Sequence, residues 1–139
     1  MHDIDKAYIA GLFDGEACFS IKQRMKKRKP ALKAYPTWDI RIEINMTDQS
    51  VIRWVYEVLG CGSFSKKPPG KGQLGKKMQW RWRCSHRDAY YVCCLLWPFA
   101  HTKLPKIQQI IEHYTTQRLK SKAKVINLEE YKNAQETSL

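Results

Sequence analysis

The chain has 139 residues, a length that suits one domain with a hydrophobic core of its own. Its 25 lysines and arginines outnumber 13 acidic residues, and the net charge of +12 indicates a polyanionic partner. No apolar run approaches the roughly 18 residues of a membrane span, and the polar, acidic N-terminus is unlike a secretory signal. We therefore expect a protein with no membrane partner.

The basic residues are clustered along the chain. No acid occurs between Ala17 and Trp38 or from Val58 through Arg87, and these stretches hold fifteen of the 25 lysines and arginines. A surface that is basic only for solubility would intersperse acids, so the gaps favour a binding surface. Five cysteines without a CxxC pair indicate reduced intracellular thiols. An organelle (mitochondrion or chloroplast) and a prokaryotic cytoplasm both meet that condition.

The first predicted element is a helix that ends near Gly15. Its apolar residues recur at helical spacing: Ile9, Leu12 and Phe13. Gly11 and Gly15 share another face, and two glycines inside one helix cost about 2 kcal/mol relative to alanine. Small residues at this spacing let a second helix pack at backbone contact. Glu16 follows at the C-terminal end, where the helix dipole disfavours a carboxylate, which indicates a bound cation.

The segment Ile9–Ala17 resembles, in order and without a gap, the LAGLIDADG motif of the homing endonucleases of that name. It has Ile for the first Leu, Phe for Ile, Gly for the second Ala, Glu for the second Asp and Ala for the last Gly. The small residues and both acids, Asp14 and Glu16, fall in place. An amphipathic core helix that ends at a glycine is the alternative interpretation.

Two alternating stretches follow, and they predict strands with one buried and one polar face. In Ala17–Lys26 the inward residues are Ala17, Phe19, Ile21 and Met25, and the outward residues are Cys18, Ser20, Lys22, Arg24 and Lys26. In Thr37–Met46 the inward residues are Trp38, Ile40, Ile42, Ile44 and Met46, and the outward residues are Thr37, Asp39, Arg41, Glu43 and Asn45. The first outward face is cationic, whereas the second mixes both signs and can read base edges. A solvated strand face is the alternative.

A helix is predicted from its N-cap Asp48 to Gly60, followed by a strand over 62–67, a loop over Pro68–Gly75 and a strand over Lys76–Cys84. The outward residues of these strands are Ser63, Ser65, Lys67, Lys77, Gln79, Arg81 and Arg83. The opposite face of the last strand carries Met78, Trp80, Trp82 and Cys84. Because these four residues occupy alternate positions of the strand, they share one face, and we assign both tryptophans to the core. Stacking of the two tryptophans on unpaired bases is the alternative.

Two further helices complete the pattern. Ser85 is the predicted N-cap of the third helix, which Trp97 and Pro98 stop, and the fourth begins around Thr102. The order of elements predicts an α+β fold, in which a four-stranded antiparallel sheet has helices on one face and a polar, basic surface on the other.

The division of the chain follows from the same pattern. We assign residues 1–117 to one domain and 118–139 to a tail that is first basic and then acidic. Within the tail, Val125–Tyr131 has the pattern of a last short helix.

The LAGLIDADG resemblance covers about residues 5–116 and implies the αββαββα fold of that family, whose sheet forms a DNA-binding saddle. The outward strand residues are then the predicted DNA-binding set: Ser20, Lys22, Arg24, Lys26, Asp39, Arg41, Glu43, Ser63, Ser65, Lys67, Lys77, Gln79, Arg81 and Arg83.

A second match lies far from the first. Trp97–Phe99 followed by Lys103 resembles the family segment in which a Pro-aromatic pair precedes an active-site lysine. The resemblance implies that Lys103 lies near the scissile phosphate, where it stabilises charge or shifts a proton. Family members often carry a polar residue after the second strand to order active-site water, but that place holds Met46 here, with Gln49 and Arg53 nearby. The water-ordering residues are therefore unassigned.

The chemistry of phosphodiester hydrolysis explains why one motif is not enough. A divalent cation neutralises the charge on the phosphate oxygens and lowers the pKa of a bound water. One carboxylate is a poor site for Mg²⁺, which prefers six oxygen ligands. The resemblance implies a homodimer with Gly11, Asp14 and Gly15 at its interface, so that two Glu16 side chains meet. Glu16 and the Gly15 carbonyl are the implied metal ligands, and Glu16 and Lys103 are the implied catalytic residues.

The sequence thus predicts a homodimeric, Mg²⁺-dependent endonuclease that cleaves both strands of a long, near-palindromic DNA site and is encoded within an intron. The alternative from another class is a nucleic-acid-binding protein that kept the scaffold and lost cleavage, either an RNA maturase that assists splicing or a transcription regulator. Glu16 favours the enzyme, and Met46 favours the binding protein. A third interpretation is one half of a two-motif enzyme.

Overall fold

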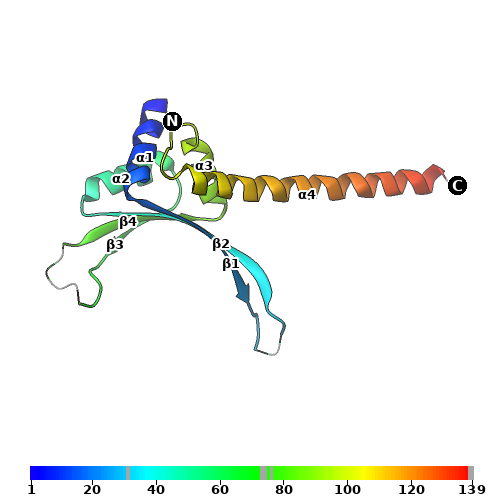
Figure 1. Cartoon of the computed structure of the whole chain (residues 1–139), viewed down its shortest axis with the longest axis horizontal. Coiled ribbons are helices and arrows are strands. Elements are labelled where there is room, and N and C mark those ends of the chain that lie inside the picture. The colour runs from blue at the N-terminus through cyan, green and yellow to red at the C-terminus, as the bar shows by residue number, and fades with distance from the viewer. Residues whose placement is uncertain (31, 73–74, 76, 138–139) are drawn as a thin grey trace.

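The computed structural model describes residues 1–30, 32–72, 75 and 77–137, with side chains described as far as Lys120. Its elements are α1 (Asp3–Glu16), β1 (Ala17–Lys26), β2 (Tyr35–Met46), α2 (Gln49–Leu59), β3 (Ser63–Lys67), β4 (Gln79–Ser85), α3 (Arg87–Leu96) and α4 (Leu104–Thr137). In Figure 1 the sheet is a curved layer with the helices on its convex side.

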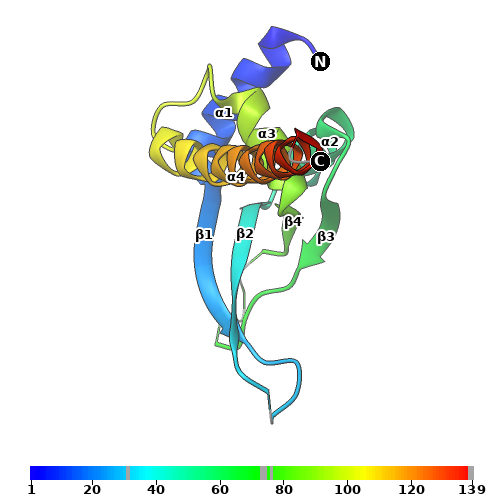
Figure 2. The same cartoon turned by 90° about the vertical axis from the view of Figure 1, so that its right-hand side faces the viewer.

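The four strands form one antiparallel sheet in the order β1-β2-β4-β3. Because side chains alternate across a strand, paired residues on neighbouring strands share a face. One such row joins Phe19 to Ile42 and Ile42 to Cys84, all three buried. Figures 1 and 2 show the helices on this face and the concave face turned away from them. The predicted α+β class, the helix–strand order and the antiparallel sheet are confirmed.

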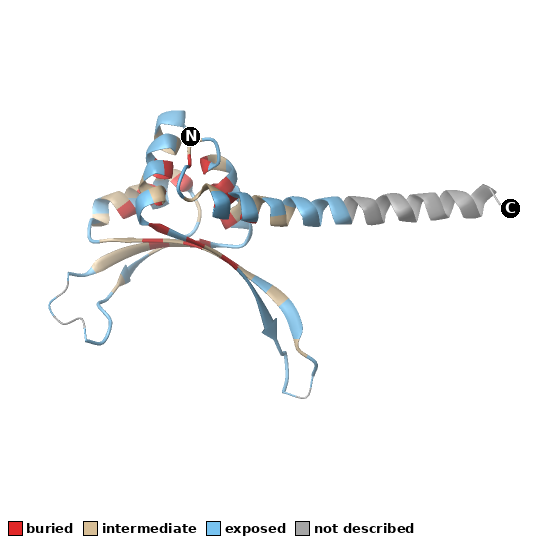
Figure 3. Ribbon diagram, in the orientation of Figure 1, coloured by how far each residue is buried: buried red, intermediate tan, exposed pale blue. Residues whose placement is uncertain are grey.

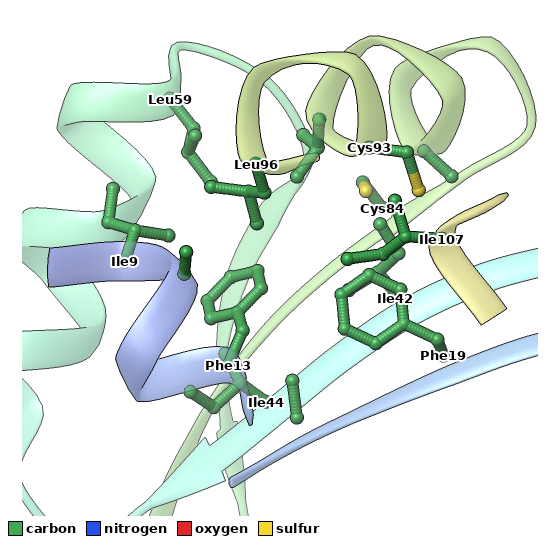
Figure 4. Close-up of a cluster of buried hydrophobic side chains, with 14 of the residues drawn as sticks. Ile9, Phe13, Phe19, Ile42, Ile44, Leu59, Cys84, Cys93, Leu96 and Ile107 are labelled. Carbon is green, nitrogen blue, oxygen red and sulfur yellow. The ribbon is translucent and has the colours of Figure 1, made fainter. Parts of the chain in front are cut away.

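The hydrophobic core lies between the sheet and the helices (Figure 3). Figure 4 labels core residues from most of the elements: Ile9, Phe13, Phe19, Ile42, Ile44, Leu59, Cys84, Cys93, Leu96 and Ile107. The ring of Phe13 in α1 lies 5.5 Å from that of Trp82 in β4, and Trp82 is completely buried. This packing fixes the last turn of α1 against the sheet, and with it the position of Glu16.

Both ends of α2 are set by the residues that the sequence indicates. The carboxylate of Asp48 accepts hydrogen bonds from the backbone N–H of Ser50 at 3.0 Å and of Val51 at 3.3 Å. The hydroxyl of Ser50, together with these N–H groups, holds the pKa of Asp48 below its ordinary value. Gly60 follows the helix with a φ of 69°, a left-handed conformation that favours glycine.

The start of α3 differs from the prediction. Ser85 is the last residue of β4, where it pairs with Arg41, and it is not the N-cap. His86 takes that position with a φ of 55° and no capping bond from its side chain. The backbone N–H of His86 donates to the carbonyl of Ile40 at 3.0 Å. This bond extends the pairing of β4 with β2 past Ser85 and keeps Ser85 in the strand, which a local sequence pattern cannot reveal.

The alternation of the first two strands continues beyond the helical layer, so not every inward residue is buried. Met25, predicted to be inward, is 65% exposed, and Trp38 is 38% exposed. Met78 is also exposed, because β4 begins at Gln79 rather than at Lys76. The sequence pattern gives the face of a residue correctly but does not show how far the helices reach.

The fourth helix is longer than predicted. It runs without a break from Leu104 to Thr137, where a separate short helix over Val125–Tyr131 was expected. The boundary that we placed after residue 117 falls inside this helix, and the division into domain and tail stays a prediction. Within the residues described, no helix combines the length and the hydrophobicity that crossing a bilayer requires.

Candidate active site and nucleic-acid interface

The end of α1 carries the acidic group that the sequence singles out. Glu16 is the last residue of the helix and is exposed, and β1 begins with the buried Ala17. The N–H of Ala17 donates to the carbonyl of Phe13, so the later carbonyls of the last turn, including that of Gly15, have no partner within the helix. The last turn of α1 therefore ends in an exposed carboxylate residue and in carbonyl oxygens without partners in the helix.

Asp14 connects this point to a distant part of the chain. Its carboxylate accepts hydrogen bonds from the backbone N–H of His101 at 2.9 Å and of Lys103 at 3.0 Å. These N–H groups precede α4, so Asp14 supplies negative charge at the N-terminal end of that helix. The bonds hold the half-buried Lys103 beside the end of α1. The structure thus brings together the two matches to the family that the sequence places far apart.

The two glycines of α1 face open space. A Cβ atom built on Gly11 or on Gly15 would meet no atom of the described part of the chain within 4 Å. Contacts within the protomer therefore do not account for the glycines. Asp14, which we predict at a dimer interface, already uses its carboxylate inside its own chain, and its role between chains stays a prediction.

The end of α1 offers only part of a metal site. Among the residues described, no three His, Cys, Asp or Glu side chains gather in a way that could hold a metal ion. The carboxylate of Glu16 and the carbonyl of Gly15 are hard oxygen donors, which suit Mg²⁺ or Ca²⁺. One chain supplies one carboxylate, that of Glu16. The donors fit a divalent cation when a second carboxylate comes from another molecule.

The concave face collects the predicted DNA-binding residues. The register pairs Ser20 with Arg41, Lys22 with Asp39, Glu43 with Arg83, and Lys67 with Gln79. By the same alternation, thirteen of the fourteen residues lie on this face: Ser20, Lys22, Arg24, Lys26, Asp39, Arg41, Glu43, Ser63, Ser65, Lys67, Gln79, Arg81 and Arg83. Lys77, the fourteenth, was expected inside a strand but precedes β4 and is exposed.

Four side chains form a network in the middle of the concave face, which we call the central network: Glu43, Asn45, Arg81 and Arg83. One oxygen of Glu43 lies 3.5 Å from Nη1 of Arg81 and 3.6 Å from Nη1 of Arg83. The other accepts a hydrogen bond from the amide nitrogen of Asn45 at 3.3 Å. Two buried atoms of the network, Oδ1 of Asn45 and Nε of Arg81, lack a partner among the described residues.

The outer part of the first two strands, residues 22–26 and 35–39, forms a second region, which we call the distal arm (Figure 1). Lys22, Arg24 and Lys26 are exposed on its concave side. Arg24 pairs with Asp39 at 3.3 Å, and the two side chains are 56% and 34% exposed. Exposed ion pairs of this kind contribute roughly 0–1 kcal/mol. The distal arm therefore carries positive charge without a fixed arrangement.

A hollow of about 660 Å³ lies where β2 ends and β4 begins. Its lining includes Thr47, Lys67, Lys77 and Gln79 together with the first residues of the loop after β3. Lys67, Lys77 and Gln79 belong to the predicted DNA-binding set, so the hollow extends that surface beyond the strands.

The two tryptophans of β4 belong to the core. Trp82 is buried and donates its indole N–H to the carbonyl of Cys61 at 3.0 Å. Trp80 stacks on Phe64 with a centroid distance of 5.4 Å and an interplanar angle of 9°. Both rings lie on the side of the sheet that faces the helices, so the alternative of stacking on unpaired bases is wrong.

The predicted site does not include Asn45, a polar residue at the end of β2. Met46 shares a face with Ile44 and packs against the core. Asn45, next to it, lies on the concave face and takes part in the central network. The alternation of β2 already indicates this orientation, but only the structure shows that Asn45 contacts Glu43.

Comparison with known proteins identifies the family. The family model described as LAGLIDADG endonuclease matches residues 9–94, more than half of the chain. The chain therefore belongs to the LAGLIDADG endonuclease family. No significant match to a curated protein is found.

Solved structures share the fold at low sequence identity. The homing endonuclease I-CvuI, in complex with the I-CreI target in 2 mM Mg with its DNA not cleaved, matches with a TM-score of 0.62 at 16% identity over 80% of this chain. The archaeal intron-encoded homing endonuclease I-Vdi141I, complexed with DNA, matches with a TM-score of 0.60 at 18% identity over 79%. I-SmaMI, bound to cleaved DNA, has a TM-score of 0.61 at 13% identity over 84%. This chain spans 66% of the length of each of the first two and 38% of I-SmaMI.

Proposed function

We propose that this protein is a homodimeric, divalent-metal-dependent DNA endonuclease that cuts both strands of a near-palindromic site. The observation that carries the proposal is the hydrogen bond from the backbone N–H of Lys103 to Asp14, which places Lys103 beside the last turn of α1, the turn that ends at the exposed Glu16. I-CvuI, I-Vdi141I and I-SmaMI, which share the fold, were all determined with DNA, and I-CvuI also in 2 mM Ca.

Each residue has a definite task in this proposal. When bound, Mg²⁺ supplies charge neutralisation at the phosphate and an acidified water. Glu16 and the carbonyl of Gly15 would hold the cation. Lys103, which Asp14 fixes through its backbone N–H, would place its ammonium near the scissile phosphate and stabilise negative charge there. The strands hold the duplex in register, because a two-stranded β-ribbon fits the major groove.

A second copy of the chain completes the site. Two helices that pack through Gly11 and Gly15 would bring two Glu16 carboxylates together and supply the missing ligands. The open space at the Cβ positions of both glycines supports this arrangement, since no described residue of the protomer lies within 4 Å of them. Two identical protomers present the same reading surface twice, so the target is expected to be nearly palindromic.

Glu16→Gln tests the metal assignment. On DNA sites that the wild-type protein cuts with Mg²⁺, the variant should lose at least about 10²–10³-fold in cleavage rate, the size of effect seen when one group that stabilises a transition state is removed. Its affinity for the same DNA should stay within a fewfold, measured by gel shift without Mg²⁺. Cleavage at the wild-type rate would remove Glu16 from the site.

Gly11→Leu tests the interface. A Cβ atom at this exposed position meets no described residue of the protomer within 4 Å, but a leucine side chain blocks backbone contact with a second helix. Light scattering should give the mass of one 16.4 kDa chain for the variant and of two for the wild type. Gly70→Ala, also in open space, is the matched control and should stay dimeric. A dimeric Gly11→Leu protein would place the interface elsewhere.

The second candidate function is binding without cleavage, as an RNA maturase or a transcription regulator. Met46 favours it, because the side chain at that position packs against the core instead of facing the site. One half of a two-motif enzyme is a further candidate, since this chain spans 38% of I-SmaMI. Encoding within an intron and residence in an organelle or a prokaryotic cytoplasm belong to the same proposal, and the five free cysteines fit a reducing compartment.

A further inference from the structure

Glu43 is an acid in the middle of a face that we propose binds DNA, where a free carboxylate would repel phosphates. Its side chain is only 24% exposed, and both of its oxygens are engaged. One contacts Arg81 and Arg83 at 3.5 and 3.6 Å, and the other accepts from Asn45 at 3.3 Å. Glu43 therefore acts on its neighbours and is poorly placed to accept a hydrogen bond from a base.

We propose that Glu43 is a positioning residue that holds Arg81 and Arg83 as a fixed pair of guanine-reading groups. The inference rests on the proposed function, because it requires DNA on the concave face. Each arginine contacts Glu43 through one nitrogen, Nη1, and keeps the Nη2 group and the second hydrogen of Nη1 for a ligand, whereas Nε of Arg81 is buried. Guanine presents two acceptors, N7 and O6, that an arginine contacts with two parallel hydrogen bonds.

The burial of the two arginines supports a role in reading bases. Their side chains are 23% and 37% exposed, compared with 56% for Arg24 of the distal arm. A side chain already held in place loses less conformational entropy on binding than a free one. Arg81 and Arg83 are two residues apart on β4, a spacing of about 6.8 Å that corresponds to about two base-pair steps.

The register places the central network close to the proposed active site. Glu43 pairs with Cys18 on β1, and Cys18 is two residues after Glu16. On the other side, Glu43 pairs with Arg83. The guanines are therefore expected in the inner part of each half-site, near the cleaved phosphates, at two positions about two base pairs apart.

The experiment is binding selection from a randomised duplex pool with the full-length protein, followed by sequencing. The wild type should prefer guanine about tenfold at two inner positions. Glu43→Gln should reduce this preference below about threefold. Because one negative charge is removed from the face, its affinity for random duplex should rise at the same time. A loss of selectivity with a gain in overall affinity is not expected from a merely structural defect, which weakens both.

Asp39→Asn is the matched control. It removes the same charge from the same face of β2, at a residue that pairs with the exposed Arg24. Its affinity for random duplex should also rise, but the two inner guanines should be retained. Arg83→Lys keeps the positive charge without the planar fork, so it should relax one of the two positions alone. If a thermal melt shows that Glu43→Gln is unfolded, Arg83→Lys carries the test instead.

The outcomes separate the two proposals. A wild-type protein that selects no DNA sequence would overturn the proposed function and this inference with it. A selected site whose inner guanines persist in Glu43→Gln would overturn the inference alone, as would a site without inner guanines. Equal loss of selectivity in Glu43→Gln and Asp39→Asn would show that any charge change on this strand has the effect, and would also overturn it.

Discussion

The concave face carries arginines in two different settings. Arg81 and Arg83 share one carboxylate, and Trp82 between them is buried under the helices on the opposite side of β4. Arg24 on the distal arm is 56% exposed, and its neighbour Met25 on the opposite side is 65% exposed. The helical layer covers the back of the central network, whereas on the distal arm α4 contacts Trp38 and leaves Met25 exposed.

This difference assigns different tasks to the two regions. A supported network has few arrangements available and can discriminate among bases, whereas exposed lysines and arginines attract phosphates of any sequence. We therefore expect the central network to determine specificity and the distal arm to contribute affinity that depends on salt.

The largest expected difference between the regions concerns stability. Trp82→Ala removes a completely buried ring from behind the central network and should cost about 3–5 kcal/mol of unfolding free energy. Trp38→Ala, on the distal arm, removes a ring that is 38% exposed and contacts His113, and should cost about 1 kcal/mol. Urea unfolding of both variants measures the two values. Equal costs would show that the distal arm is as firmly supported as the centre.

The next effect concerns DNA binding. Lys22→Ala should weaken binding to selected and to random duplex alike, and should reduce the slope of log affinity against log salt by about 0.9. Arg81→Ala should instead weaken the selected site about tenfold and random duplex much less. Fluorescence anisotropy at several salt concentrations gives both quantities. If Lys22→Ala altered sequence preference, or Arg81→Ala lowered all affinities equally, the division of tasks would be wrong.

The smallest effect is a pH dependence at the contact between α4 and the distal arm. The ring of His113 lies 4.8 Å from that of Trp38, and burial lowers the pKa of His113 below 6.5. The unfolded chain then binds the proton more readily, so this contribution to stability is complete above pH 6.5 and is lost as the pH falls toward the folded pKa. Urea unfolding at pH 5.5 and 7.5 should show the loss, and His113→Gln should reduce it. An unchanged difference in the variant would assign it to other groups.

The sequence predicts the fold well because its signals are local. The alternation of Ala17–Lys26 and the caps Asp48 and Gly60 depend on neighbouring residues, and the structure confirms them. Ser85 is not a cap because its pairing with Arg41 of β2, distant in sequence, keeps it in the strand. For the same reason no pattern indicates that Asp14 holds the N–H of Lys103.

The candidate site could be predicted in part. The motif and alternation single out Glu16, Lys103 and the residues of the concave face. They do not show that Glu43 is shared by two arginines, because that contact depends on the register of β2 against β4. Nor do they show how far the helices extend over the strands, which distinguishes the two regions.

The most direct test of the central claim is to expose a randomised duplex library to the wild-type protein with Mg²⁺ and to sequence the cut ends. The account predicts cuts in both strands at one family of nearly palindromic sites, and no cuts with Glu16→Gln. Cuts at sites without symmetry would contradict the paired arrangement. If the protein bound specific duplexes but did not cut them, the assignment as an endonuclease would be contradicted.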